Sequence, residues 1–359
     1  MTSAKHLSLA ISCVALSLLG CREPSLESGE PVIVVHQGIC DASAVVDLGQ
    51  GRFAVADDEL NLLLVYQAGR PGEAISKAEV SEFLDVVKPP KKKKPKPGKA
   101  NKPDKPPQPK VKEVDMEGAA RVGDTIYWIT SHGRKKSGKQ AAERMQLFAT
   151  RIVGQGGHIE LVPQGTPYNN LLEDLLADER YAQLGLEAAA EKAPKEPGGL
   201  NIEAMTDLPD GTLLIGFRSP LVDGQAIVAT LLNPHEIIDG EAPRFGDPKF
   251  LDLGGRGLRG MSSHEGTILI AANDPEGDDH RPQLLRWDGD SPTAELLDVV
   301  DLSDFNPEGI TLLPDFKGGK LLLLSDDGTR PIGPDECPCK DLKDHTQRQF
   351  RSMTVDWRE

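Results

Sequence analysis

Hydrophobic and polar positions follow one pattern in five segments of the chain. Each segment has a polar start, a short apolar run, a turn, a more strongly apolar run and a polar end. The five segments are residues 41–61, 115–134, 201–220, 257–275 and 306–328. Short apolar runs bounded by Gly, Pro, Asn and Asp predict β-strands joined by tight turns. The pattern therefore predicts five similar β-hairpins.

Additional strands are predicted between these hairpins. A third strand follows each hairpin, at residues 62–67, 144–153, 226–233, 283–289 and 349–357. A weaker fourth strand follows in the first four units, at residues 82–87, 157–163, 249–255 and 294–300. One strand, 31–38, precedes the first hairpin and is left over.

Four-stranded units repeated around a ring are typical of a β-propeller. We count five blades in an all-β domain at residues 31–359, and the leftover strand 31–38 is predicted to complete the fifth blade. This closure matters because an open ring would leave sheet edges unpaired. A count of six blades is the second possibility from the sequence. The alternative fold is a β-sandwich with chance similarity between its hairpins.

Two segments do not fit the strand pattern. Residues 88–112 contain 11 Lys and 8 Pro and no apolar periodicity, so we expect a disordered insertion, either a tolerated loop or a basic arm. Residues 168–194 are rich in helix formers and predict a helical insertion. Its apolar positions at helical spacing are Leu171, Leu172, Leu175, Leu176 and Leu184.

The N-terminus has the pattern of an export signal. Lys5 precedes an apolar stretch that ends in Leu-Leu-Gly-Cys at Cys21. We expect residues 1–20 to be a signal peptide and 21–30 a tether. The ending resembles the lipobox of bacterial lipoproteins, which implies that Cys21 is acylated and anchors the chain in a bilayer, at the periplasmic face or in the outer membrane. The alternative is an ordinary secretion signal.

The net charge limits the possible binding partners, and the cysteines suggest a disulfide. A net charge of −15 argues against general binding to nucleic acid. Export permits disulfides, and we expect Cys40 to pair with Cys337 or Cys339, although unpaired thiols are the alternative. The sequence gives no sign of an oligomer, so a monomer is the default.

One position of the repeat carries candidate chemistry. The residue two after the starting Asp or Asn is, in chain order, Ser43, Glu117, Glu203, Arg259 and Glu308. The first strand of each propeller blade lines the central channel, so these side chains are expected to converge there. Glu117, Glu203 and Glu308 then form a candidate site for Ca²⁺ or another divalent cation. The alternative is structural, with each Glu accepting backbone N–H groups from the next blade and the following Gly allowing close approach.

The ends of the second strands supply further polar residues around the same channel mouth. Arg218 at such an end, Arg256 nearby in sequence and Arg259 at the repeated position suit the carboxylate or phosphate of a ligand. Asp58 and Asp327 are candidates for binding the same ligand. If the protein is a hydrolase, His132 and Glu203 are the candidate catalytic residues, because carboxylate, imidazole and metal together activate water.

Several phrases resemble those of a bacterial family catalogued as domain of unknown function 3616. They include "DMEGAA", "GLNIEAM", "LLIGFRSPL", "LDLGGRGLRGM" and "LLSDDG", in that order along the chain. The chain differs from the family in Ala204, where the family more often has Gly, and in its Lys/Pro-rich insertion. The resemblance implies no established activity. The phrases are also distantly similar in style to esterase-like phytase propellers.

Two functions follow from these features. The first is an exported lipoprotein that binds an anionic small molecule, glycan or envelope partner at the central channel mouth. The second is a metal-assisted hydrolase of an ester or phosphoester.

Overall fold

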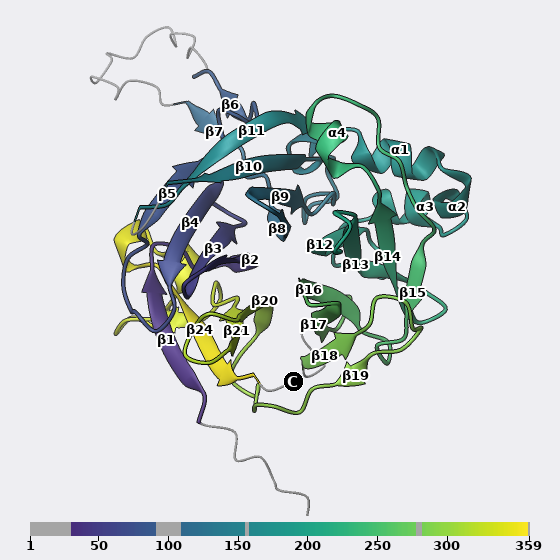
Figure 1. The fold of residues 1–359 in the computed structure, drawn as a ribbon. Helices are drawn as coiled ribbons and strands as arrows, with labels where there is room; N and C mark the ends of the chain where they lie inside the picture. The colour runs from purple at the N-terminus through teal and green to yellow at the C-terminus, as the bar shows by residue number, and fades with distance from the viewer. Residues whose placement is uncertain (1–29, 91–108, 155–157, 278–281, 358–359) are drawn as a thin grey trace, which may run out of the picture.

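Five antiparallel four-stranded sheets stand around a central axis in the computed structural model (Figure 1). The structure describes residues 30–90, 109–154, 158–277 and 282–357. The arrangement is a five-bladed β-propeller, so the predicted fold and the count of five blades are confirmed.

The first four blades each follow the chain from the innermost strand outwards. Blade 1 contains β2 (Ala42–Gly49), β3 (Arg52–Asp57), β4 (Leu62–Gln67) and β5 (Ser76–Glu79). Blade 2 contains β8 (Met116–Val122), β9 (Thr125–Thr130), β10 (Leu147–Val153) and β11 (Glu160–Tyr168). Blade 3 contains β12 (Asn201–Asp207), β13 (Leu213–Val222), β14 (Gln225–Leu231) and β15 (Lys249–Leu251). Blade 4 contains β16 (Gly257–His264), β17 (Thr267–Asn273), β18 (Gln283–Trp287) and β19 (Glu295–Leu296).

The fifth blade is built from both ends of the chain. Its strands from the axis outwards are β20 (Pro307–Leu313), β21 (Lys320–Ser325), β24 (Gln349–Asp356) and β1 (Val32–Gln37). β1 pairs antiparallel with β24 from Val32↔Thr354 to Gln37↔Gln349. The prediction that the leftover N-terminal strand completes the last blade is confirmed.

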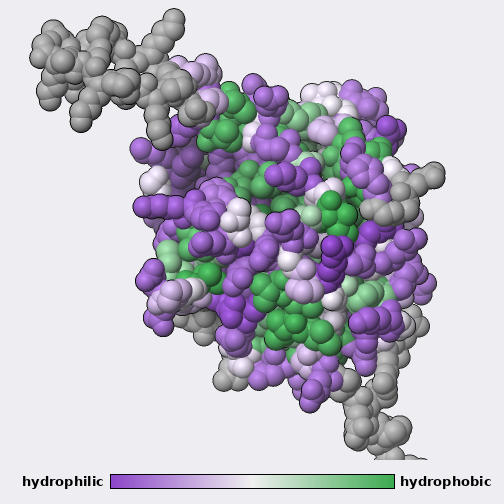
Figure 2. Space-filling view, turned by 90° about the vertical axis from the view of Figure 1, so that its left-hand side faces the viewer, coloured by the Kyte–Doolittle hydropathy of each residue, from purple (hydrophilic) through white to green (hydrophobic). Residues whose placement is uncertain are grey.

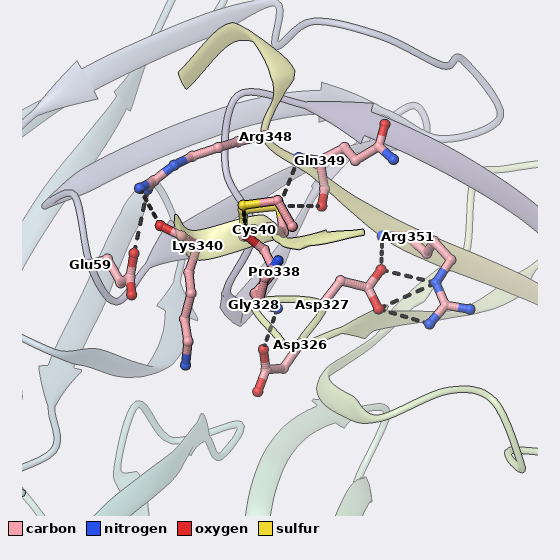
Figure 3. The surroundings of a disulfide bond; sticks show 12 residues. Cys40, Glu59, Asp326, Asp327, Gly328, Pro338, Lys340, Arg348, Gln349 and Arg351 are labelled. Carbon is pink, nitrogen blue, oxygen red and sulfur yellow. Dashed lines mark hydrogen bonds and ion pairs between the residues drawn. A yellow bond between two sulfur atoms is a disulfide. The ribbon is translucent and has the colours of Figure 1, made fainter. Parts of the chain in front are cut away.

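A disulfide reinforces this closure. Cys40, just before blade 1, is bonded to Cys339, in the segment between β21 and β24, and the two residues are 299 positions apart in sequence. Figure 3 shows the bond beside Arg348 and Gln349. Cys337 is a free thiol. Of the two pairings left open by the sequence, the structure contains the one with Cys339.

Apolar contacts hold each blade to the next. Five hydrophobic clusters fill the five spaces between neighbouring blades. In blade 1 the predicted fourth strand at 82–87 is wrong, because Leu84 and Val86 lie in a turn packed into the cluster between blades 1 and 2. The fourth strand is instead the more polar β5.

The predicted helical insertion is confirmed and consists of three short helices. They are α1 (Leu171–Ala177), α2 (Glu179–Ala182) and α3 (Leu186–Ala190). These helices lie on the outside of the ring, between blades 2 and 3 (Figure 1). Gly185, at φ 73°, separates α2 from α3. A fourth helix, α4 (Pro234–Ile238), follows β14.

The Lys/Pro-rich insertion is described only at its two ends. Val87–Lys88 (β6) and Lys110–Val111 (β7) pair as a small two-stranded ladder, so the boundaries 88–112 were too wide for a disordered segment. Residues 91–108 lie outside the described part of the chain, as do the predicted signal peptide, Cys21 and nearly all of the tether.

Smaller elements and the outer surface complete the fold. A ladder of β22 (Pro331–Ile332) and β23 (Cys337–Pro338) and short 3₁₀ helices at Ala142–Arg144, Cys339–Asp341 and His345–Gln347 decorate the loops. Among the described residues no helix has the length and hydropathy to span a bilayer. Hydrophilic residues cover most of the side seen in Figure 2, interrupted by a hydrophobic patch in its lower half.

Candidate functional site at the upper channel mouth

The residue at the repeated sequence position is a β-bulge in every blade. In each innermost strand the pairing register skips one residue, and the five skipped residues are Ser43, Glu117, Glu203, Arg259 and Glu308. A bulge leaves its extra residue outside the ladder and redirects its side chain. The five-fold repeat of one sequence phrase is therefore a five-fold repeat of one backbone irregularity next to the axis.

We call the two ends of the channel the upper and lower mouth. At the upper mouth the innermost strands begin and the second strands end, as the pairs Ala42↔Asp57 and Pro307↔Ser325 show. At the lower mouth the innermost strands end. The bulged residues lie near the upper mouth, and four of them line a narrow axial cavity, namely Ser43, Glu117, Glu203 and Glu308.

The glycines after two bulges allow neighbouring blades to approach closely. A Cβ at Gly260 would lie 2.2 Å from the carbonyl oxygen of Glu308 in blade 5. A Cβ at Gly118 would lie 3.0 Å from the backbone nitrogen of Met205 in blade 3. The structural role expected for these glycines is present, whereas Ala204 shows that blade 3 tolerates a methyl group at the same position.

The five bulged residues surround the axis, and we call them the bulged ring. One half of this ring is a buried ion network. Glu203 contacts Arg218 through Oε1 at 2.9 Å and Arg259 through Oε2 at 3.0 Å. Arg259 also contacts Glu308, and the amide of Asn201 donates to Glu203 at 2.5 Å. Both arginine side chains are only 6% exposed. Two carboxylates and two guanidinium groups from blades 3, 4 and 5 therefore balance one another.

The other half of the ring is acidic. Glu117 lies beside Asp58 and Asp115, and one carboxylate oxygen from each of the three lies within 4.8 Å of the others. Arg144 contacts Asp115 at 2.7 Å and also pairs with Glu113. Arg144 is the guanidinium in direct contact with this acidic trio of Asp58, Asp115 and Glu117, and Arg259 and Arg218 act on Glu117 less strongly than the neighbouring carboxylates do. The trio therefore keeps an excess of negative charge.

Burial makes this excess costly. Loss of hydration raises the pKa of Glu117 and of Asp58 well above the usual range, and neighbouring carboxylates raise both further. Burial also raises the pKa of Asp115 to about 6, against the lowering effect of Arg144. The trio is therefore short of positive charge in the absence of a bound cation.

The geometry of the acidic trio fits a divalent cation. Calcium binds oxygen at about 2.3–2.6 Å, so two oxygens on one ion lie at most about 4.6–5.2 Å apart. The 4.8 Å limit of the trio falls in that range. Asp58 Oδ1 and Ser43 Oγ are buried and have no hydrogen-bond partner in the described part of the chain. These orphan oxygens are further potential ligands.

The predicted metal ligands are thus only partly available. Glu117, Glu203 and Glu308 do meet around the axis, as the repeat predicted. However, arginines occupy Glu203 and Glu308, whereas Glu117 joins Asp58 and Asp115 instead. Arg218 and Arg259 are likewise occupied and do not present free guanidinium groups to an anion. Arg256 donates to the backbone carbonyl groups of Leu253 and Gly254 at 3.3 and 3.5 Å and remains partly exposed.

His132 and Asp327 do not reach the acidic trio. His132 lines an apolar cavity with Leu171, Leu175 and other side chains between blades 2 and 3, and burial lowers its pKa to about 4. A buried imidazole in this apolar cavity is not placed as the acid–base group of the channel. Asp327 accepts hydrogen bonds from Arg351 at 2.8 and 2.9 Å and is buried (Figure 3), which indicates a structural role.

Three residues of the site were missed from the sequence. Asp115 is the starting Asp of its repeat and lies two residues before Glu117, so the repeat phrase itself held this signal. Asp41 is the equivalent residue of blade 1, and burial, together with the charge of Asp326, raises its pKa to about 9. Arg144 lies in a loop between β9 and β10 and carries no recognisable motif.

Comparisons with solved structures give matches of low similarity. A glutaminyl cyclase from Myxococcus xanthus is 11% identical, with 91% of this chain and 96% of that chain covered and a TM-score of 0.42. A putative oxidoreductase (glucose dehydrogenase) from Thermus thermophilus is 14% identical, with 90% and 100% covered and a TM-score of 0.40. The PQQ-bound aldose sugar dehydrogenase of Streptomyces coelicolor is 13% identical, with 90% and 98% covered and a TM-score of 0.40. Scores this low carry no argument about function.

Sequence comparisons are more specific. A search of curated proteins finds no significant match. A family model matches residues 158–329, a stretch that includes the helical insertion, all of blades 3 and 4 and the first two strands of blade 5. That model describes DUF3616, a protein family of unknown function, and its match confirms the family resemblance carried by the sequence phrases of this region.

Proposed function

We propose that this protein is an exported lipoprotein whose upper channel mouth binds a divalent cation, Ca²⁺ being the natural candidate. Through that cation it binds an anionic small molecule, glycan or envelope partner. The observation that carries the proposal is the acidic trio, whose three carboxylate oxygens lie within 4.8 Å of one another, with Arg144 as the guanidinium in direct contact among the described residues. A hard cation with oxygen ligands suits such a site.

The channel itself is too narrow to hold the ligand. Its axial cavity has a volume of about 10 Å³ for the centre of a water-sized sphere, which is roughly the space that one water molecule needs. An anionic ligand therefore sits above the cation, at the rim of the mouth. Arg256 is the partly exposed arginine among those predicted to grip an anion, and it lies at the start of blade 4 on the same face.

Calcium titration of the full exported domain tests the cation site. We expect Ca²⁺ to raise the melting temperature and to bind with a stoichiometry of one by calorimetry. Asp58→Asn removes one of the three carboxylates and should weaken binding at least tenfold. Asp223→Asn, on the exposed turn between β13 and β14, is the matched control and should bind as the wild type does. Unchanged binding by Asp58→Asn would rule out this site.

A metal-assisted hydrolase is the second candidate. It is favoured by the acidic trio itself, because a divalent cation held by carboxylates can activate a bound water molecule for attack on an ester or phosphoester. The same protein samples, with Ca²⁺ and with a chelator, should then turn over p-nitrophenyl esters or phosphates only when the ion is bound. Cation binding without turnover would contradict the hydrolase and support the binding function.

Lipid anchoring rests on the ending Leu-Leu-Gly-Cys at Cys21. Cells expressing the full-length chain with an alkynyl fatty acid should label the wild type and lose the label in Cys21→Ser. Cys337→Ser, which removes the free thiol, is the matched control and should retain it. Labelling that persists in Cys21→Ser would refute the anchor while leaving the cation site untouched.

A further inference from the structure

The lower mouth of the channel contains a second polar cavity, separate from the acidic trio. It has a volume of about 310 Å³, and its lining comes from the ends of innermost strands in all five blades. Five apolar residues below the bulges separate it from the upper mouth, namely Val45, Ala119, Met205, Met261 and Ile310. Each is buried in a different inter-blade cluster, and the two cavities have no lining residue in common.

The charged groups of this lower cavity are Asp47, Arg121 and Asp207, with His264 beside them. Each of the first three lies four residues after a bulged residue of its strand. The sequence repeat therefore places polar residues at the lower mouth as well as at the upper mouth. Such cavities of about 300 Å³ hold small molecules rather than bare ions.

Arg121 does not neutralise the two carboxylates by direct contact. Its Nε donates to the carbonyl oxygen of Gly123 at 2.8 Å, and its Nη1 donates to the carbonyl oxygen of Asp47 at 2.7 Å. Neither Asp47 nor Asp207 forms an ion pair within the described residues. Two carboxylates from blades 1 and 3 therefore face one guanidinium that is committed to backbone carbonyl groups.

The hydrogen bonds to these carboxylates leave acceptor capacity unused. The Asp47 carboxylate accepts from the backbone N–H of Gly49 at 3.0 Å. The Asp207 carboxylate accepts from the backbone of Arg121 and from the hydroxyl of Ser263. An ionised carboxylate offers about four lone-pair sites. Burial raises the pKa of both groups, which agrees with a local shortage of positive charge.

We propose that the lower cavity binds a small organic cation, a primary ammonium group on a short alkyl chain, between Asp47 and Asp207. The ammonium group supplies the positive charge and three N–H donors. Val46, Leu312 and Pro314 line the same cavity and contact the alkyl chain.

A divalent ion fits this cavity less well than the upper mouth. Within the described ranges, the acidic trio is the group of three or more carboxylate, imidazole or thiolate donors close enough to share an ion. The lower cavity has no such group, and a cation whose charge is spread over several N–H donors suits two carboxylates from separate blades.

Calorimetry with a charged probe and its neutral counterpart tests the proposal. We expect 1,4-diaminobutane to bind to the full exported domain with a dissociation constant in the millimolar range or below. Butane-1,4-diol has the same length without the charge and should not bind. Equal binding of the diol, or absence of binding by the diamine, would overturn the proposal.

Substitutions show where the diamine binds and distinguish the lower cavity from the cation site at the upper mouth. Asp207→Asn and Asp47→Asn should each weaken diamine binding at least tenfold. If one of these two variants fails to fold, the other still tests the site. Asp58→Asn, at the upper mouth, should leave diamine binding unchanged. Loss of diamine binding in Asp58→Asn, or displacement of the diamine by Ca²⁺ in the wild type, would assign the diamine to the upper mouth and refute the lower site.

Discussion

The two halves of the bulged ring start from the same sequence phrase and end with opposite electrostatics. Glu203 and Glu117 occupy equivalent positions in adjacent blades. Glu203 lies between two buried arginines, whereas Glu117 lies beside two further carboxylates. The difference shows that the repeat determines where a carboxylate points, and that the neighbouring blade determines whether its charge is balanced.

One substitution made at both positions gives the largest contrast. Glu203→Gln removes the charge shared by Arg218 and Arg259, and breaking one side of a buried ion pair costs about 3 kcal/mol. We expect the free energy of unfolding, measured in urea at pH 8 with a chelator, to fall by about that amount.

Glu117→Gln should act in the opposite direction under the same conditions. It removes a carboxylate whose ionisation burial and neighbouring carboxylates oppose, so we expect the free energy of unfolding to rise. Addition of Ca²⁺ should then stabilise the wild type more than this variant. Equal effects of the two substitutions would contradict the division of the ring into a balanced and an acidic half.

The pH dependence of stability sharpens the same comparison. Burial raises the pKa of Asp57 to about 7 and that of Asp41 to about 9. A folded state with raised carboxyl pKa values binds more protons than the unfolded state, so stability is lost as the pH rises toward those values. Without metal, we expect the contribution of Asp57 to the free energy of unfolding to be lost between about pH 4 and 7, and that of Asp41 between about pH 4 and 9, each by up to about 1.4 kcal/mol per pH unit.

Buried histidines contribute the opposite slope at lower pH. Burial lowers the pKa of His36 and of His132 to about 4, so their contribution is lost as the pH falls from about 6.5 to 4. Below pH 6.5 the histidines and the buried carboxyl groups change the free energy of unfolding in opposite directions as the pH changes. Above pH 6.5 the carboxyl groups alone of these two sets determine its slope. Asp41→Asn should flatten that slope between pH 7 and 9. Asp327→Asn, in the pair with Arg351, should lower stability without changing the slope.

The ring, its closure and the convergence of Glu117, Glu203 and Glu308 were predictable from the sequence, because strand periodicity and repetition are local signals. The fourth strand of blade 1 was not, because an apolar run such as 82–87 packs into a core equally well as a turn. Asp41 and Asp115 stood in the repeat phrase but were not recognised as site residues.

The pairing of charges was beyond the sequence. Arg259 is itself a bulged residue, and its contacts with Glu203 and Glu308 depend on which blades are neighbours across the axis. Arg144 reaches Asp115 from a loop without any periodic pattern. Side-chain partners that come from different blades require the ring to be closed before they can be identified.

The position of the disulfide also determines how the fold responds to mechanical force. A pull on the N-terminal end of the chain loads β1 first, and its six residue pairs with β24 would separate before any other strand is disturbed. Three residues beyond β1 the load reaches Cys40, where a covalent bond to Cys339 passes it to the other end of the chain. A propeller pulled by this end would lose one outer strand under tension and keep its inner ring intact.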